Sequence, residues 1–169
     1  YFELENKLPN LDLRIIQSGV DAAALLKDGQ CDLVLTPLLP ESSEFKQQKI
    51  FEDEFLCFYD SEVTAAPKTL TDYLTRRHAR IVFSSVETNP IDQMLAVQGY
   101  HRRVALQVPS FSGLPGLMKG TDLIAVLPSS IRNSIMHEFK TAPSPLPIDS
   151  MVFYQIWHKR DDDRPVHQW

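Results

Sequence analysis

The feature that most constrains this chain is a pair of apolar runs with a helical segment between them. Residues 11–16 (LDLRII) end in β-branched residues, as strands often do, and residues 31–35 (CDLVL) form a near-continuous apolar run. Such a run is typical of a strand that is buried on both faces. Between the two runs, Ser18 can cap a helix over residues 19–28 that Gly29 would end. A strand, a helix and a strand with short links predict a right-handed βαβ unit and therefore a parallel sheet.

The rest of the chain continues this alternation of strands and helices. The further predicted strands are 55–59, 80–83, 104–108, 122–126 and 151–158. The further predicted helices are 1–8 (the last turns of a helix), 70–76, 90–98, 112–119 and 129–139. We expect a loop over 41–48 and an extended, proline-rich connector over 141–147. Two such series predict an α/β fold of two lobes with a cleft between them.

The charge balance argues against nucleic-acid binding by this chain. The net charge is −5, whereas affinity for nucleic acids comes largely from basic groups that neutralise phosphates. The densest basic cluster, Arg76, Arg77, His78 and Arg80, is interpreted as the solvated end of a helix. No apolar run approaches the ~20 residues of a membrane helix, so we expect no membrane contact. The two cysteines lie in apolar runs and predict free, buried thiols in a reducing compartment, the cytoplasm.

Catalytic and metal-binding patterns are weak. The sequence has no G-x-S-x-G nucleophile elbow and no glycine-rich phosphate loop. A metal site can be drawn from His158, Asp161 and His167, but their spacing matches no ligand pattern, and a structural Trp157 beside a solvated charge run is favoured. The remaining histidines are expected to be exposed: His78, His101 and His137. We therefore expect no enzyme activity, no cofactor and no metal.

Four segments, in order, resemble one known family. The step LLKDGQCDLVL within residues 18–35 resembles the helix-to-strand step of LysR-type transcription regulators, and IFEDEFLCFYDSE resembles the strand that enters their second lobe. RRVALQVPSFSGLPGLMKGTDLIAVLP is similar to the segment that crosses that lobe. PLPIDSMVFYQIWHKRDDDRPVHQW is similar to the return strand and last helix of the branch that includes nodulation and aromatic-degradation regulators.

The resemblance implies a fold and a function. The fold is like that of type 2 periplasmic binding proteins: two Rossmann-like lobes, one formed by residues 1–53 with 151–169 and one by residues 54–150. The first strand of lobe one would precede Tyr1, and the last helix would be cut short. The function would be the sensing of a small-molecule effector in the cleft, on behalf of an N-terminal winged helix-turn-helix domain that binds DNA. The full protein would be a homodimer or a tetramer; an apolar edge strand at 11–16 also favours assembly.

Two other classes of function remain open at this point. A stand-alone solute-binding protein of a transport system would share the two lobes and the cleft. An enzyme on the same fold would need a catalytic constellation, which the sequence does not offer. The sequence upstream of Tyr1 would distinguish the three, because a regulator would have a helix-turn-helix there and a transport protein a secretion signal.

The candidate effector-binding residues follow from the general geometry of α/β sheets. Ligands bind beyond the carboxyl ends of the strands, where hydroxyls and helix N-termini converge. Applied to the two lobes, this rule selects Gln17, Ser18, Gly19, Thr36 and Pro37, and Ser84, Ser85, Thr88, Ser110 and Phe111. The hydroxyls and helix-start amides suit a carboxylate and the phenyl ring suits an aromatic ligand, so an aromatic acid or another carboxylate is the expected effector. The alternative is that the serines are ordinary helix caps.

Overall fold

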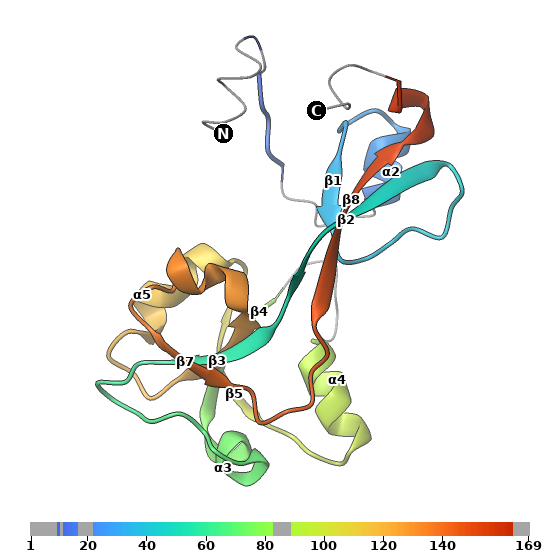
Figure 1. The fold of residues 1–169 in the computed structure, drawn as a ribbon. Coiled ribbons are helices and arrows are strands. Elements are labelled where there is room, and N and C mark those ends of the chain that lie inside the picture. The colour runs from blue at the N-terminus through green and yellow to red at the C-terminus, as the bar shows by residue number, and fades with distance from the viewer. Residues whose placement is uncertain (1–9, 11, 17–21, 83–88, 164–169) are drawn as a thin grey trace.

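The computed structural model describes residues 10, 12–16, 22–82 and 89–163, and within them the chain forms two separate β-sheets. The first sheet has three strands in the order β1-β8-β2, and the second has five in the order β5-β4-β6-β3-β7. Figure 1 shows the two sheets at opposite ends of the molecule, joined by a long ribbon made of β2 and β8. The mixed α/β architecture in two parts agrees with the prediction of two lobes.

The first sheet is entirely antiparallel and is built around the last strand of the chain. Strand β8 (Met151–His158) pairs with β1 (Val34–Thr36) on one side and with β2 (Phe45–Asp53) on the other. Helix α2 (Ala22–Lys27) packs on this sheet, and its Leu26 is buried together with Val34 and Ile156. This small apolar cluster forms because α2 presents one leucine to the face of the sheet on which Val34 and Ile156 pair.

Two predictions fail in this region. Residues 12–16, within the predicted strand 11–16, are exposed and belong to no helix or strand, so the predicted parallel βαβ unit is not formed. Residues 45–48, in the predicted loop, begin strand β2. Strand β2 pairs on one side only and nearly all of its side chains face solvent, which explains why a strand here has a polar sequence.

The second sheet is mixed. Its strands are β3 (Phe55–Tyr59), β4 (Arg77–Ile81), β5 (Arg103–Val108), β6 (Ile124–Pro128) and β7 (Lys140–Pro143). Strand β4 is parallel to β5 and β6, whereas β3 is antiparallel to β6 and β7. Central β6 alternates between two apolar clusters, with Ala125 and Leu127 on one face and Ile124 and Val126 on the other. Burial on both faces is what its unbroken apolar sequence predicts.

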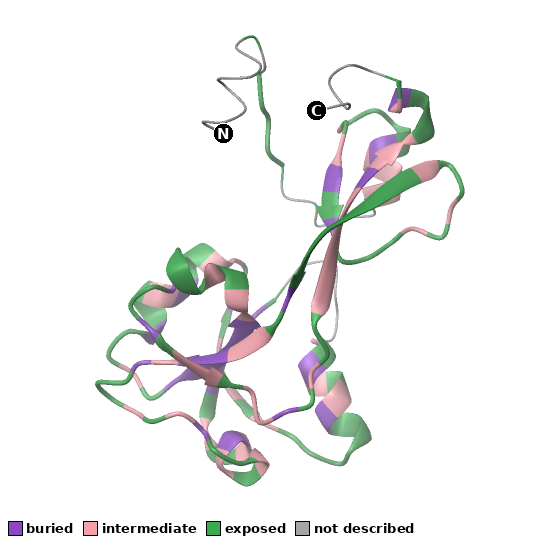
Figure 2. Ribbon diagram, viewed as in Figure 1, coloured by how far each residue is buried: buried purple, intermediate pink, exposed green. Residues whose placement is uncertain are grey.

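The helices of this part confirm two predicted starts. Thr69 caps α3 (Leu70–Thr75), because its hydroxyl accepts a hydrogen bond of 3.1 Å from the amide of Asp72. Asn89 caps α4 (Pro90–Val97), because its side-chain oxygen accepts a hydrogen bond of 2.9 Å from the amide of Ile91, and Pro90 occupies the first helical position. Figure 2 shows how the buried residues concentrate around the second sheet, while much of the joining ribbon is exposed or half-buried.

Three other predictions in this part need correction. The predicted helix 112–119 is a 3-10 turn, η1 (Phe111–Gly113), followed by a short α5 (Leu114–Met118). The predicted helix 129–139 is regular only in the 3-10 turn η2 (Ser129–Asn133). The expected connector 141–147 begins as edge strand β7, which tolerates Pro143 at its end because nothing pairs beyond it.

Several single-residue expectations can also be checked. Both cysteines are free: Cys57 is fully buried, which raises the pKa of its thiol to about 12, whereas Cys31 is only half-buried. Trp157 has the structural role expected of it, since its indole N–H donates to the Asp162 carboxylate over 2.9 Å. None of the helices in the described ranges is long and apolar enough to span a membrane.

Candidate functional site

The predicted effector-binding residues divide into those that the structure describes and those that it does not. Thr36, Pro37, Ser110 and Phe111 are described. The others lie outside the described residues: Gln17, Ser18, Gly19, Ser84, Ser85 and Thr88.

Thr36 ends strand β1 and Pro37 follows it; the strand points toward the place where the ribbon leaves the first sheet (Figure 1). The Thr36 side chain is buried, and its hydroxyl accepts a hydrogen bond of 3.0 Å from the amide of Leu38. The same hydroxyl lies 3.4 Å from the Leu38 carbonyl, to which it donates. Thr36 therefore shapes the turn after β1, and Pro37 is exposed beside it.

Ser110 and Phe111 follow the carboxyl end of β5 in the second sheet. Ser110 has extended backbone (φ −150°, ψ 157°) at the start of η1, but its side chain makes no capping hydrogen bond. Its hydroxyl instead lies 3.0 Å from the hydroxyl of Ser112. The helix-cap alternative therefore does not describe Ser110. The Phe111 ring packs partly against the core of the second sheet.

The two described pairs of candidate residues belong to different sheets. A site that used both pairs would lie between the sheets, near the crossing of the ribbon. At this crossing lies a residue that the sequence analysis did not select. Asp53, the last residue of β2, has a side chain that is only 3% exposed.

Asp53 is held by three hydrogen bonds from the start of η2. The Ser129 hydroxyl donates to its Oδ1 over 2.7 Å, and the Ser130 amide donates to Oδ1 over 3.1 Å and to Oδ2 over 3.3 Å. Burial by itself would raise the pKa of Asp53, but the hydrogen bonds from Ser130 and Ser129 outweigh it and hold the pKa below its ordinary value. The signal in the sequence is an acidic residue two positions before the first residue of an aromatic strand, FEDEFLCF.

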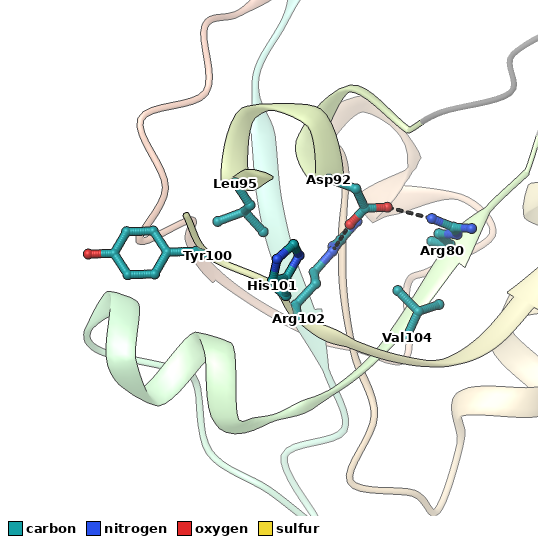
Figure 3. Close-up of a pocket in the computed structure, with 7 residues that line it drawn as sticks. All are labelled: Arg80, Asp92, Leu95, Tyr100, His101, Arg102 and Val104. Carbon is teal, nitrogen blue, oxygen red and sulfur yellow. Dashed lines mark hydrogen bonds and ion pairs between the residues drawn. The ribbon is translucent and has the colours of Figure 1, made fainter. Parts of the chain in front are cut away.

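A pocket of about 180 Å³ opens elsewhere, beside α4 and strands β4 and β5. Its lining, drawn in Figure 3, consists of Arg80, Asp92, Leu95, Tyr100, His101, Arg102 and Val104. None of these residues was among the predicted site residues, because they do not follow the ends of predicted strands.

The polar wall of this pocket is centred on one carboxylate. Figure 3 shows Asp92 between the two arginines: Arg102 Nε donates to Oδ1 over 2.6 Å and Arg80 Nη1 to Oδ2 over 2.5 Å. Arg102, whose side chain is 2% exposed, also donates to the Tyr73 hydroxyl over 2.9 Å. Burial would raise the pKa of Asp92, but the two arginines together hold it below its ordinary value. These groups mainly satisfy each other, so we interpret them as a structural polar network joining α4 to the sheet.

His78, next to this network, corrects an expectation. It was predicted to be exposed and is fully buried in β4. Its Nε2–H donates to the Tyr73 carbonyl over 2.8 Å, and its ring meets the Tyr73 ring edge-on with centroids 4.4 Å apart. Burial, assisted by the nearby charge of Arg102, lowers the pKa of His78 to about 4.

The prediction that the basic cluster around His78 is a solvated helix end holds only for Arg76, which caps the C-terminus of α3. Arg77, His78 and Arg80 lie in β4, and each of the three arginines of the cluster is paired with an aspartate. The pairs are Arg76 with Asp72, Arg77 with Asp122 and Arg80 with Asp92. As for metals, no group of three His, Cys, Asp or Glu side chains within the described residues is arranged to hold an ion, and His167 lies outside them.

Curated proteins with similar sequences are bacterial transcription regulators. The HTH-type transcriptional activator NagR of Ralstonia sp is 27% identical over 149 residues, which are 85% of this chain and 49% of that protein. The HTH-type transcriptional activator NahR of Pseudomonas putida is 23% identical over 162 residues, 93% of this chain and 54% of that protein. Nodulation protein D 1 of Mesorhizobium japonicum is 26% identical over 95% of this chain and 53% of that protein. The chain thus spans about half the length of these relatives.

Solved structures support the same fold. The regulatory domain of MexT, a transcriptional activator in Pseudomonas aeruginosa, superposes with a TM-score of 0.85 at 22% identity, over 99% of this chain and 85% of that one. The BenM effector-binding domain with its effector benzoate superposes with a TM-score of 0.69 at 16% identity, over 94% of this chain and 75% of that one. A family model described as the LysR substrate binding domain matches residues 3–169. The chain belongs to the LysR substrate-binding domain family.

Proposed function

We propose that this chain is the effector-sensing part of a LysR-type transcription regulator. It binds a small-molecule inducer between its two sheets and passes the resulting change to a DNA-binding domain elsewhere in the protein. The match of the family model to nearly the whole chain carries this proposal. The names of the curated relatives, transcriptional activators and nodulation proteins, support a regulator over a solute-binding protein of a transport system.

The division into lobes follows the membership of the strands. We assign residues 1–53 with 151–169 to the first lobe and residues 54–150 to the second. This assignment is supported by the fact that β1, β2 and β8 form one sheet and that all strands between β2 and β8 form the other.

The proposed effector site lies between the lobes. It comprises Ser18, Gly19, Thr36, Pro37, Ser84, Ser85, Thr88, Ser110 and Phe111. The hydroxyl of Ser110 supports it best, because this group caps no helix and its described hydrogen bond goes to another serine hydroxyl. A carboxylate that accepts hydrogen bonds from such hydroxyls would be held by about 1–3 kcal/mol for each bond. The benzoate bound by BenM makes an aromatic acid the first ligand to test.

The test compares Ser110→Ala with a matched serine far from the crossing. Ser61 is exposed after the distal end of β3, so Ser61→Ala serves as the control. Calorimetric titration with benzoate and a panel of substituted benzoates should show affinity lowered about ten-fold or more in Ser110→Ala and unchanged in Ser61→Ala. The melting temperatures of both apo variants should match the parent. Lower stability with unchanged affinity in Ser110→Ala would refute the site assignment.

The partners of the whole protein are proposals of the same kind. We propose a homodimer, or a tetramer in the full-length protein, that acts in the cytoplasm and contacts DNA only through its separate DNA-binding domain. The net charge of −5 supports that division of labour, because it disfavours contact with phosphates. Sequence-selective gel shifts by residues 1–169 alone would contradict it.

A further inference from the structure

Two crossings of the chain join the sheets, and they differ in length. The first runs from β2 to β3 and contains only Glu54 between the strands. The second runs from β7 to β8 through residues 144–150. The short crossing leaves little freedom between the strands it joins, so its contacts decide where the molecule can bend.

The side chain of Asp53 ties the short crossing to the second sheet. All three of its hydrogen bonds come from Ser129 and Ser130, which directly follow β6. The carbonyl of Glu54 accepts a further bond of 2.7 Å from the amide of Ser129. Residues 53 and 54 therefore continue the ladder of β3 and β6 beyond its last pair, Phe55 with Pro128.

The end of the ribbon next to Asp53 is stiffened as well. Asp53 pairs with Met151, and Phe51 pairs with Phe153. The rings of Phe51 and Phe153 stack with centroids 4.8 Å apart and planes 16° apart. The Ser150 hydroxyl donates to the Glu52 carboxylate and so joins the second crossing to the end of β2.

The regular ladder is interrupted on the other side of this stack. The register of β2 on β8 shifts between Lys49 and Phe51, so Ile50 has no partner residue on β8. A bulge of this kind bends a ribbon and interrupts its hydrogen bonds. It is the weakest point of the β2–β8 ribbon between the two sheets.

We propose that Asp53 is a positioning residue. It makes residues 51–53 and 151–153, which belong to strands of the first sheet, move together with Glu54 and the second lobe, and it shifts the pivot of lobe motion to the bulge at Ile50. The first lobe then swings at the bulge, three residues before Asp53, while residues 51–54 and 151–153 stay fixed on the second sheet. The role of this pivot in sensing rests on the proposed function; the mechanical role of Asp53 does not.

Distances between spin labels test the proposal in the whole chain. Cys57 is fully buried, so a Cys31→Ala background leaves no accessible thiol other than the introduced ones. One label pair joins Gln47→Cys, beyond the bulge, to Thr71→Cys on α3; the other joins Val152→Cys, in the stiffened section, to Thr71→Cys. In the parent chain we expect the first pair to give a distance distribution about twice as wide as the second.

Removing the Asp53 carboxylate, which accepts these hydrogen bonds, should abolish the difference in width between the two label pairs. Asp53→Ala should widen the Val152–Thr71 distribution about two-fold, whereas Asp53→Asn should stay close to the parent, because its amide oxygen still accepts from Ser129 and Ser130. Asp122→Ala, which loses an exposed ion pair at the far end of the second sheet, is the control and should change neither width.

Each result decides the proposal. Unchanged widths in Asp53→Ala, or equal widths for the two label pairs in the parent, would overturn it, and so would an Asp53→Asn variant as broad as Asp53→Ala. If Asp53→Ala does not fold, Ser129→Ala takes its place; it removes one of the hydrogen bonds and should widen the Val152–Thr71 distribution by a smaller factor, and no widening would overturn the proposal. Failure of benzoate and its analogues to shift the Gln47–Thr71 distance would count against the proposed function alone, since the comparison of widths needs no ligand.

Discussion

The two sheets of this chain are stabilised to very different degrees. Among the described residues, the first sheet has three buried apolar side chains, Leu26, Val34 and Ile156. The second sheet has a cluster of eleven buried residues on one face and a cluster of seven buried residues on the other. Because stability scales with the apolar surface removed from water, the second sheet can hold its shape alone, whereas the first depends on further contacts.

The sheets differ in their polar interiors as well. Around the second sheet, Asp92 joins Arg80 and Arg102 beside the buried His78. Around the first, ion pairs such as Lys27 with Glu44 are about half exposed. Exposed pairs add little to stability, while a buried network fixes one arrangement of its elements. The chain thus combines one rigid part, around the second sheet, with one that is more easily displaced.

The largest test of this difference removes the centre of the polar network. Asp92→Ala leaves the guanidinium of Arg102 buried without its carboxylate, which should lower the free energy of unfolding by about 3–5 kcal/mol. Urea titration followed by far-UV circular dichroism measures it. The control is Asp122→Ala, whose pair with Arg77 is about half exposed and should cost roughly 0–1 kcal/mol. Equal losses in both variants would contradict a rigid, network-stabilised second lobe.

One tryptophan allows the two sheets to be followed separately. Trp157 lies in β8 of the first sheet. In a Trp169→Phe background, tryptophan fluorescence therefore reports on the first sheet. In Asp92→Ala, the transition seen by circular dichroism should move toward the transition seen by fluorescence.

The next largest effect is a dependence of the stability of the second lobe on pH. The pKa of His78 is about 4 in the folded chain, compared with an ordinary value of 6.5. The His78 ring binds a proton more readily in the unfolded chain than in the folded chain. The stability that neutral His78 contributes to the fold is therefore fully present above pH 6.5 and is lost as the pH falls toward 4. At about 1.4 kcal/mol for each pH unit, the loss approaches roughly 3 kcal/mol.

Unfolding titrations between pH 7 and pH 4 measure this loss. His78→Gln, whose side-chain amide can still donate to the Tyr73 carbonyl, should flatten the profile over that range. His137 is exposed, and His137→Gln should leave the profile of the parent unchanged. A parent profile that is already flat would show that His78 is not held neutral by burial.

The smallest effect is a difference in the stability cost of the same substitution, leucine to alanine, made once in each sheet's core. Leu114→Ala in the second core should cost about 3 kcal/mol, because dense packing on all sides prevents the cavity from closing. Leu26→Ala in the first cluster should cost about 2 kcal/mol, since its half-exposed neighbours can move in. Both leucines are almost fully buried, so the contrast reports on their surroundings. Circular dichroism and Trp157 fluorescence together measure the two costs; a larger cost for Leu26→Ala would reverse the comparison.

The sequence predicts the second sheet better than the first, for a related reason. In the second sheet, strand 55–59 matches β3, strand 104–108 matches β5 to within one residue, and the capped starts of α3 and α4 are as predicted, because apolar runs and N-caps are local signals. In the first sheet, strand 151–158 matches β8. The polar strand β2 escaped prediction, since its pairing with β8 is a contact over more than a hundred residues that leaves no local pattern. The predicted parallel unit failed because strand direction depends on partners elsewhere in the chain.

The candidate site shows the same limit. The rule that ligands bind at strand ends selected Thr36 and Ser110, which remain predictions, and the structure shows that Ser110 caps no helix. The rule did not select Asp53, whose hydrogen-bond partners lie 76 and 77 residues away. Nor could it place His78 inside the protein, because a histidine between two arginines has the local sequence of a surface.

The place of β8 in the first sheet also determines the order in which the chain can fold during its synthesis. Strands β1 and β2 do not pair with each other, and both wait for residues 151–158. All five strands of the second sheet are complete by Pro143. The ribosome thus releases a finished second lobe first, while the first lobe assembles around a strand made more than a hundred residues later than β1. Long-range pairing of this kind is slow, so the nascent first lobe is the part that exposes unpaired strand edges for longest.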